Sequence, residues 1–321
     1  MNLQTHIAFS EEARPRIDYQ SKLLLLGSCF SEHIGDRLSY FKFQVVQNPL
    51  GILFHPKAIE RLISSAIDKK EYSDKDVFTH NERWHSFDAH SKLSDLSKNN
   101  VLSNLNLAIE KTRNQLVQAT HLIITLGTAW VYRHIESDRI VANCHKVPNK
   151  HFLKELLSVD AITESLSAII ALVSNINPEV TIIFTVSPVR HLKEGVVENL
   201  RSKSHLITGL HRVVDTENHV FYFPSYELMM DELRDYRFYA GDMIHPNETA
   251  IQYIWNTFER VWISKSELAI MSEVDSVQKR LNHTPFYPMS EEHRLFLERL
   301  SRDIKSLKQR LPLASFEKHR L

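Results

Sequence analysis

The segment KLLLLGSCFSEHIGDRL, Lys22–Leu38, places a hydroxyl and a thiol side by side where the sequence pattern changes. Four leucines typical of a buried strand end at Gly27, and an amphipathic segment typical of a helix follows Ser28 and Cys29. A helix N-terminus lowers the pKa of a thiol, and its unpaired N–H groups can hold an oxyanion. A hydroxyl there needs a base to take its proton. The alternative interpretation is a tight turn of small residues in which Ser28 caps the helix.

A second segment, GDMIHPN, places Asp242 and His245 three residues apart. In a turn, this spacing lets the carboxylate bond the imidazole, fix its tautomer and support its positive charge. The pattern is also common in surface pairs. Its position after the last predicted strand makes it a candidate for catalysis.

Five short apolar segments predict strands, with helical patterns between them. The predicted strands are Leu23–Leu26, Phe43–Val46, His121–Leu126, Val180–Val186 and His219–Phe223. The predicted helices are Ser31–Tyr40, Lys57–Lys69, Val101–Ala119, Ser158–Ile176 and Glu198–Thr216. Strands joined by long helical crossovers pair in parallel, so we expect an α/β sheet covered on both faces.

Small and polar residues follow every predicted strand, at the edge where open parallel sheets bind ligands. They are Gly27, Ser28 and Cys29, then Asn48 and Gly51, then Gly127 and Thr128, then Ser187, Arg190 and His191, and finally Asp242 and His245. This coincidence predicts a site at the carboxyl edge of the sheet.

Other polar side chains are weaker candidates for substrate binding. The polar segment 72–100, a predicted long loop or insertion, carries His85, Ser86 and His90, for which a solvated loop is the alternative. His145, Arg190 and His191 could bind an anionic or sugar substrate, because a guanidinium suits carboxylates and phosphates.

Composition narrows the class of protein. Lys and Arg number 39 and equal Asp and Glu in the 321 residues, so no nucleic-acid partner is expected. Two cysteines suit a reducing compartment, and we find neither a signal-peptide pattern nor an apolar stretch of membrane-spanning length. We therefore expect a soluble, cytoplasmic protein. There is no zinc motif and no Gly-rich phosphate loop, so we expect no metal and no cofactor.

The C-terminal part reads as a helical extension over residues 266–321, after a main domain over residues 1–265. Within it, Ser290–Leu311 predicts a charged helix with leucines at three- and four-residue spacing. Two interpretations stay open for the leucine stripe: docking on the main domain, or a homodimer contact.

Six segments occur in a distinctive order: GSCFSEHIGDRL, NPLGILFHP, LGTAWVY, NCHKVP, TVSPVRH and YFPSYELMMDELRDYRFYAGDMIHPN. Together they resemble the GSCFA family, a bacterial group named for its N-terminal motif. The resemblance runs from about Leu3 to about Ile263, with Ser31 in place of the final Ala of the name motif. The family is similar to the SGNH/GDSL hydrolase superfamily. That similarity implies a flavodoxin-like, three-layer α/β domain with a central parallel sheet.

Enzymes of that superfamily use a nucleophile just after the first strand and a D-x-x-H element near the C-terminus. The resemblance places the second element on Asp242 and His245. It places the nucleophile motif on Gly27-Ser28-Cys29, so that Cys29 is the nucleophile; a shift of one residue would make it Ser28.

The oxyanion donors correspond less completely. The oxyanion glycine of the superfamily corresponds to Gly51, and its Gly-x-Asn element falls on Gly127–Ala129, where the expected Asn is absent. Asn48, Thr128 or His55 would then have to supply the missing donor.

The resemblance implies a hydrolase or acyltransferase acting on an acyl ester or thioester of a small molecule or carbohydrate. A cysteine nucleophile would form a thioester, which water, an amine or a hydroxyl could then attack. The alternative is a catalytically inactive α/β module that binds a glycan or an acylated ligand. The missing Asn favours that alternative.

Overall fold

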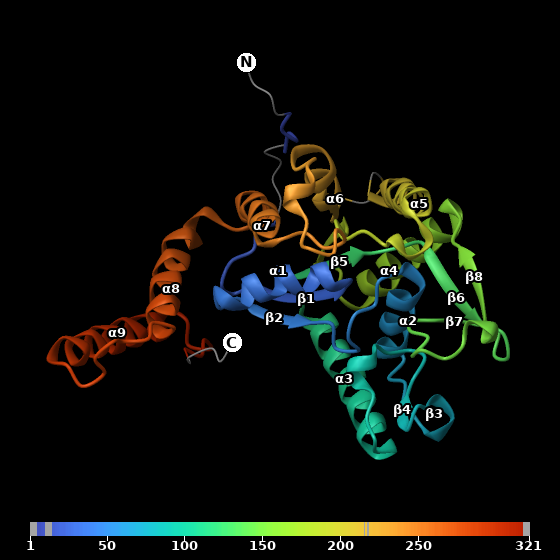
Figure 1. Ribbon diagram of the computed structural model, residues 1–321, viewed down its shortest axis with the longest axis horizontal. Helices are drawn as coiled ribbons and strands as arrows, with labels where there is room; N and C mark the ends of the chain where they lie inside the picture. The colour runs from blue at the N-terminus through green and yellow to red at the C-terminus, as the bar shows by residue number, and fades with distance from the viewer. Residues whose placement is uncertain (1–4, 10–14, 215, 217, 317–321) are drawn as a thin grey trace.

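The computed structural model describes residues 5–9, 15–214, 216 and 218–316 (Figure 1). The start of the family resemblance near Leu3 lies outside these ranges, as do the start of the first predicted domain and the end of the second. Residue 215, within the last predicted helix of the sheet region, also lies outside them.

A parallel sheet of five strands forms the centre of the molecule, which confirms the predicted α/β class. The strands are β1 (Lys22–Gly27), β2 (Gln44–Gln47), β5 (His121–Leu126), β9 (Thr181–Val186) and β10 (Val220–Phe223). Their order is β10-β9-β5-β1-β2, and all neighbouring pairs are parallel. This is the flavodoxin-like order, whose switch point lies between β1 and β5.

Helices cover both faces of this sheet, because successive strand residues point to opposite sides. Leu24 and Leu26 pack into a core with α2 (Pro56–Ile67), α3 (Lys98–Gln118), α4 (Val159–Ile176) and α5 (Val196–Val214). Leu23 and Leu25 pack into a second core with α1 (Cys29–Tyr40) and α7 (Glu248–Trp262). The two cores fix β1, and therefore the turn that follows it, from both sides.

Helix α4 corrects one expectation from the sequence. Among the described residues it is the one helix long and apolar enough, by length and composition, to cross a membrane. The sequence analysis found no stretch of that kind. Ile162, Leu166 and Ile169 of α4 are buried in the core beneath the sheet, which accounts for its apolar composition.

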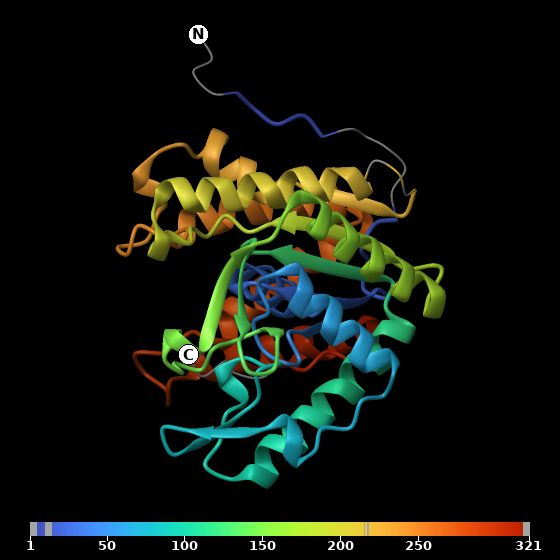
Figure 2. The ribbon, with the colours of Figure 1, turned by 90° about the vertical axis from the view of Figure 1, so that its right-hand side faces the viewer.

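Two small additions extend the sheet domain. Segment 72–100 contains the hairpin β3 (Phe78–His80) and β4 (Arg83–His85), which lies against α3 (Figures 1 and 2). Strands β6 (Trp130–His134), β7 (Arg139–Val141) and β8 (Phe152–Leu156) form an antiparallel sheet that the sequence analysis did not predict. These strands are short and bury few of their residues, so they carry only a weak apolar pattern.

The C-terminal helices α8 (Leu268–Leu281) and α9 (Glu291–Arg310) lie at the opposite end of the molecule from that antiparallel sheet (Figure 1). Helix α9 buries Leu300 and Leu307 in the same core as Val274 of α8. Docking within the chain is therefore what the structure shows for this stripe. A homodimer contact stays a prediction.

Candidate functional site

The turn between β1 and α1 brings the two candidate nucleophiles to the switch point of the sheet. Gly27 has a φ of +137°, and a Cβ there would collide with the carbonyl oxygen of Thr125 on β5, so only glycine fits. The Ser28 N–H donates to that same carbonyl at 3.0 Å. Ser28 is 1% exposed, whereas Cys29, the first residue of α1, is only partly buried. Cys29 is therefore the more accessible of the two.

Ser28 does not cap the helix with its side chain. It occupies the N-cap position of α1, but its hydroxyl makes no capping hydrogen bond. Its Oγ is buried and has no hydrogen-bond partner among the described residues. The prediction that the Ser28 side chain caps the helix is therefore wrong, since a capping hydroxyl accepts a hydrogen bond from a backbone N–H of the first turn.

Burial decides the acidity of the Cys29 thiol. Desolvation raises its pKa above the ordinary value, against the lowering effect of the N–H groups of Phe30 and of Cys29 itself. Glu32 on the same helix raises the pKa further, and Lys203 lowers it. The expectation of a lowered thiol pKa at this helix end is wrong. The N–H groups act in the expected direction, but the loss of water outweighs them.

Asp242 and His245 form a directly bonded pair. The His245 Nδ1 lies 2.7 Å from the Asp242 Oδ2. Asp242 Oδ1 accepts the backbone N–H groups of Ile244 at 2.9 Å and His245 at 3.0 Å. These bonds lower the Asp242 pKa to about 2, with the His245 backbone N–H as the largest cause. The carboxylate can hold the ring in one tautomer with Nε2 free to accept a proton.

The His245 ring lies within electrostatic range of the helix that carries Cys29. It interacts electrostatically with His33 of α1 and with His191 after β9. His33 is four residues after Cys29, so the two side chains share one helix face. Among the described residues, however, neither the Cys29 thiol nor the Ser28 hydroxyl is hydrogen-bonded to the His245 ring. The structure brings base and nucleophile to one edge without joining them.

Asn48 emerges as the best-placed side-chain donor near the end of β1. Its Oδ1 accepts the Gly27 N–H at 2.9 Å, which fixes the orientation of the amide. Its Nδ2 is buried and has no hydrogen-bond partner among the described residues. A buried, unpartnered N–H at a ligand-binding edge is costly in the absence of a ligand and is suited to donate a hydrogen bond to an oxyanion.

The other expected oxyanion donors are already engaged. The Gly51 N–H donates to the Asn48 carbonyl at 2.7 Å, and the Gly127 N–H donates to the Phe54 carbonyl at 2.7 Å. Thr128 Oγ1 is bonded to Ser202 Oγ at 2.9 Å. The expectation that Gly51 offers a free N–H is therefore wrong in this structure.

His55 is also engaged, as the N-cap of α2. Its Nδ1 accepts the Ala58 N–H at 3.1 Å, and its Nε2 lies 3.1 Å from the Val141 carbonyl oxygen. Burial lowers its pKa to about 4, which keeps the ring neutral. His55 positions a helix and has no free nitrogen for an oxyanion.

His85 and His90, two of the histidines considered as ligands for substrate, lie in segment 72–100, and His145 packs against that segment. His145 Nε2 lies 2.7 Å from the Ser86 carbonyl oxygen, and its ring centroid lies 4.6 Å from that of His85. His90 packs against Gly51, whose φ is +76° and whose Cβ would collide with the His90 Cβ. These contacts hold the hairpin segment against the sheet domain.

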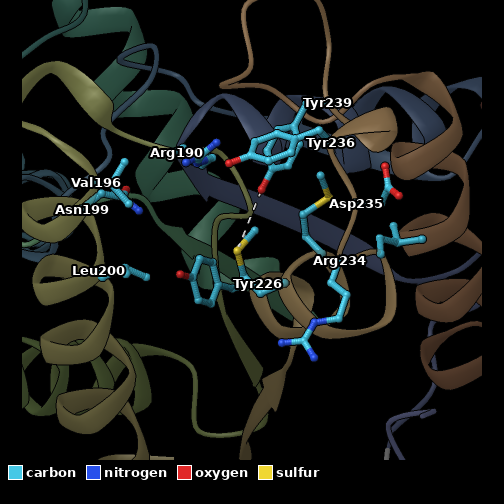
Figure 3. A pocket seen from close by; sticks show the side chains of 12 residues that line it. Arg190, Val196, Asn199, Leu200, Tyr226, Arg234, Asp235, Tyr236 and Tyr239 are labelled. Atoms are coloured by element: carbon cyan, nitrogen blue, oxygen red, sulfur yellow. Dashed lines mark hydrogen bonds between the residues drawn. The ribbon is translucent and has the colours of Figure 1, made fainter. Parts of the chain in front are cut away.

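A cavity of about 240 Å³ lies beside the Asp242–His245 loop. Figure 3 shows Arg190 next to the rings of Tyr236 and Tyr239, with Leu200 of α5 on another wall. Arg190 ties this wall to the loop, since its Nη1 donates to the Met243 carbonyl at 3.2 Å. The lining is mainly apolar and aromatic with few charged groups, as in pockets that bind small molecules.

The sequence analysis missed Lys203 of α5. Its side chain is 1% exposed, and its Nζ donates to the carbonyls of Gly127 and Ser187, each at 2.7 Å. The sequence carried a signal for this burial. Asn199, Lys203, Leu206, Leu210 and Val213 recur at four- and three-residue spacing, so Lys203 falls in the inward stripe of the helix.

His191 is partly exposed, but its Nε2 is buried and has no hydrogen-bond partner among the described residues; burial lowers its pKa to about 3. Within the described part of the chain, no three His, Cys, Asp or Glu side chains cluster closely enough to hold a metal ion.

Comparison with known families and structures places this geometry in context. The family model described as GSCFA family matches residues 22–258, and the model described as GSCFA domain protein, C-terminal domain, matches residues 274–321. Comparison with curated protein sequences gave no match.

Three solved structures are distantly similar. One is a carbohydrate esterase family 3 protein from Talaromyces cellulolyticus, with a TM-score of 0.37 and 9% identity, and the match covers 79% of this chain and 99% of that one. Another is an acetyl esterase mutant with acetate ion, with a TM-score of 0.37 and 10% identity, covering 79% of this chain and 99% of that one. An acetyl xylan esterase from Butyrivibrio proteoclasticus has a TM-score of 0.34 and 10% identity, covering 76% of this chain and 65% of that one. Similarity at these TM-scores is too distant to assign an activity.

Proposed function

The chain belongs to the GSCFA family, and from this premise and the site geometry we propose that it hydrolyses or transfers an acyl group from an ester or thioester. The Asp242–His245 pair carries the proposal, because it is directly bonded and lies within electrostatic range of the helix whose first residue is Cys29. A histidine oriented by a carboxylate beside a nucleophile is the arrangement that acyl transfer requires.

In the proposed reaction, His245 Nε2 takes the proton of the Cys29 thiol as the sulfur attacks the carbonyl carbon. The carbonyl oxygen becomes an oxyanion, which Asn48 Nδ2 and the first N–H groups of α1 stabilise. The oxyanion collapses, the bond to the leaving oxygen or sulfur breaks, and His245 protonates the leaving group. A thioester on Cys29 remains. Water, a hydroxyl or an amine then attacks the thioester carbonyl while His245 takes the proton of this acceptor. The C–S bond breaks, the acyl product leaves, and His245 returns the proton to the Cys29 sulfur.

The cavity beside the pair is the proposed site for the apolar or ring-bearing part of the substrate. Its tyrosines offer flat apolar faces, and Arg190 adds a cation 5.3 Å from the ring centroid of Tyr239. Rings of this kind stack on sugars and on acyl chains alike. This lining supports a carbohydrate or other small acyl ester as the substrate class.

A second candidate, a catalytically inactive binding module, is favoured by one observation. The Cys29 thiol has a raised pKa and is not hydrogen-bonded to His245. A thiol that stays protonated and undirected would leave the cavity as a binding site only.

The Asp242→Asn variant tests the proposed function. An amide in place of the carboxylate no longer holds the catalytic tautomer of His245, so hydrolysis of p-nitrophenyl acetate should fall by roughly 10²- to 10⁴-fold. The melting temperature should stay unchanged, because the pair lies largely in solvent. Equal turnover by the variant and the wild type would refute the pairing of roles and support the binding module.

A further inference from the structure

The Lys203 ammonium lies at the same edge of the sheet as the proposed nucleophile. Its two acceptors, the carbonyls of Gly127 and Ser187, directly follow β5 and β9. Cys29 directly follows the Ser28 turn at the end of β1, which pairs with β5. One side chain from α5 thus reaches the edge where three strands end.

A buried cation needs compensation, since removing an ammonium from water costs several kcal/mol even after relaxation. Among the described residues, no carboxylate forms an ion pair with Lys203. Glu227 acts on it electrostatically, but the Tyr222 hydroxyl donates to that carboxylate. The Tyr226 ring centroid lies 5.4 Å from Nζ. The two carbonyls satisfy hydrogen bonds without neutralising the charge.

The Cys29 sulfur lies within electrostatic range of the Lys203 ammonium. Burial lowers the Lys203 pKa to about 7, while a thiolate at Cys29, and then Glu227, raises it. In the other direction, Glu32 raises the Cys29 pKa and Lys203 lowers it, with the smaller effect of the two. His191 also faces Lys203, and burial keeps that ring neutral. Among the described residues, Lys203 has no fixed charged partner. Of the groups named here, a thiolate at Cys29 is the negative charge that can compensate the ammonium.

We propose that Lys203 is a positioning residue that supplies the counter-charge for a thiolate at Cys29. Two strand-end carbonyls hold the ammonium in place, and it acts through the sulfur by charge alone, with no bond made or broken at Nζ. The inference rests on the proposed function only in taking Cys29 as the nucleophile. It also gives a physical reason for a partly buried thiol at this helix end to ionise.

The test is the pH profile of Cys29 alkylation by iodoacetamide in the wild type and in Lys203→Met, an apolar side chain of similar length. Peptide mass spectrometry separates Cys29 from Cys144, which serves as the control thiol within the same chain. In the variant, the Cys29 midpoint should rise by about one pH unit or more, and its alkylation near neutral pH should slow about tenfold. The Cys144 profile should not move.

A purely structural role for Lys203 predicts the opposite result. Loosened packing would expose Cys29 and speed its alkylation, so a faster or unchanged Cys29 reaction overturns the proposal. Should Lys203→Met fail to fold, the wild type decides: Cys29 must ionise at lower pH than Cys144, and an equal or higher midpoint rejects the counter-charge. Alkylation needs no turnover, so failure here is distinguishable from an absence of esterase activity.

Discussion

The Asn48 side chain has a structural acceptor, Oδ1, and a donor for the proposed chemistry, Nδ2. Its Oδ1 holds the Gly27 N–H, while its Nδ2 is buried without a partner among the described residues. Sequence reasoning named three residues that could replace the missing oxyanion Asn. Only a structure could choose among them, because Thr128 and His55 are excluded by hydrogen bonds to residues distant in sequence.

Replacing the donor while keeping the acceptor tests this assignment. In Asn48→Asp, a carboxylate oxygen can still accept the Gly27 N–H, but an oxygen replaces the Nδ2 donor and faces the developing oxyanion. We expect kcat/KM for p-nitrophenyl acetate to fall by about 10²- to 10³-fold. Asn104→Asp makes the same change on the exposed face of α3 and should leave kcat/KM as in the wild type. Equal activity of the two variants would remove Asn48 from the oxyanion site.

The burial of Lys203 was not predicted from the sequence. A lysine in a helix is normally solvated, and NLRSKSHLITG reads as an ordinary helix with one charged face. Its place in the inward stripe was visible in the sequence. Its two carbonyl partners were not, because they come from the ends of two strands.

At the scale of elements, hydrophobic pattern predicted the central sheet well. All five parallel strands lie within one residue of their predicted bounds. The three central strands β1, β5 and β9 are short runs of mainly apolar residues buried on both faces. Strands β6, β7 and β8 were missed because they are partly exposed and rich in charged residues. The acidity of Cys29 was misjudged for a related reason. The helix end is visible in sequence, but the degree of burial is not.

The loop after β2 owes its shape to Gly51. Its φ of +76° and its contact with His90 both exclude a side chain. Gly51→Ala should therefore lower the free energy of unfolding by about 1–3 kcal/mol, measured by urea denaturation. Gly241→Ala is the matched control, since a Cβ there meets no atom within 4 Å. A Gly51→Ala protein as stable as the control would contradict the close approach of the insertion.

At the scale of the whole molecule, the C-terminal helices pack on the side of the sheet that carries α1. The Tyr40 hydroxyl at the end of α1 donates to Asp275 of α8 at 2.9 Å, and Gln278 of α8 donates to the Tyr40 carbonyl at 3.3 Å. Because α1 begins at Cys29, the extension supports the helix that carries the proposed nucleophile from its far end.

Two leucines of α9 separate docking from dimerisation. Leu307 is 1% exposed and Leu297 is 48% exposed. Leu307→Ala should cost about 2–5 kcal/mol of unfolding free energy, and Leu297→Ala within about 0.5 kcal/mol. Light scattering on Leu297→Asp then tests the predicted homodimer, because a charge on the exposed stripe would dissociate it. A Leu307→Ala protein of unchanged stability would show that α9 is not docked in solution.

The central claim is that Cys29, assisted by His245, receives an acyl group. The most direct measurement is peptide mass spectrometry of the wild type, Ser28→Ala, Cys29→Ala and His245→Ala after brief exposure to p-nitrophenyl acetate. We predict an acetyl thioester on Cys29 in the wild type and in Ser28→Ala, none in Cys29→Ala, and slower formation in His245→Ala. An adduct on Ser28 would move the nucleophile back by one residue. No adduct at either position, with the protein folded, would contradict the claim and favour the binding module.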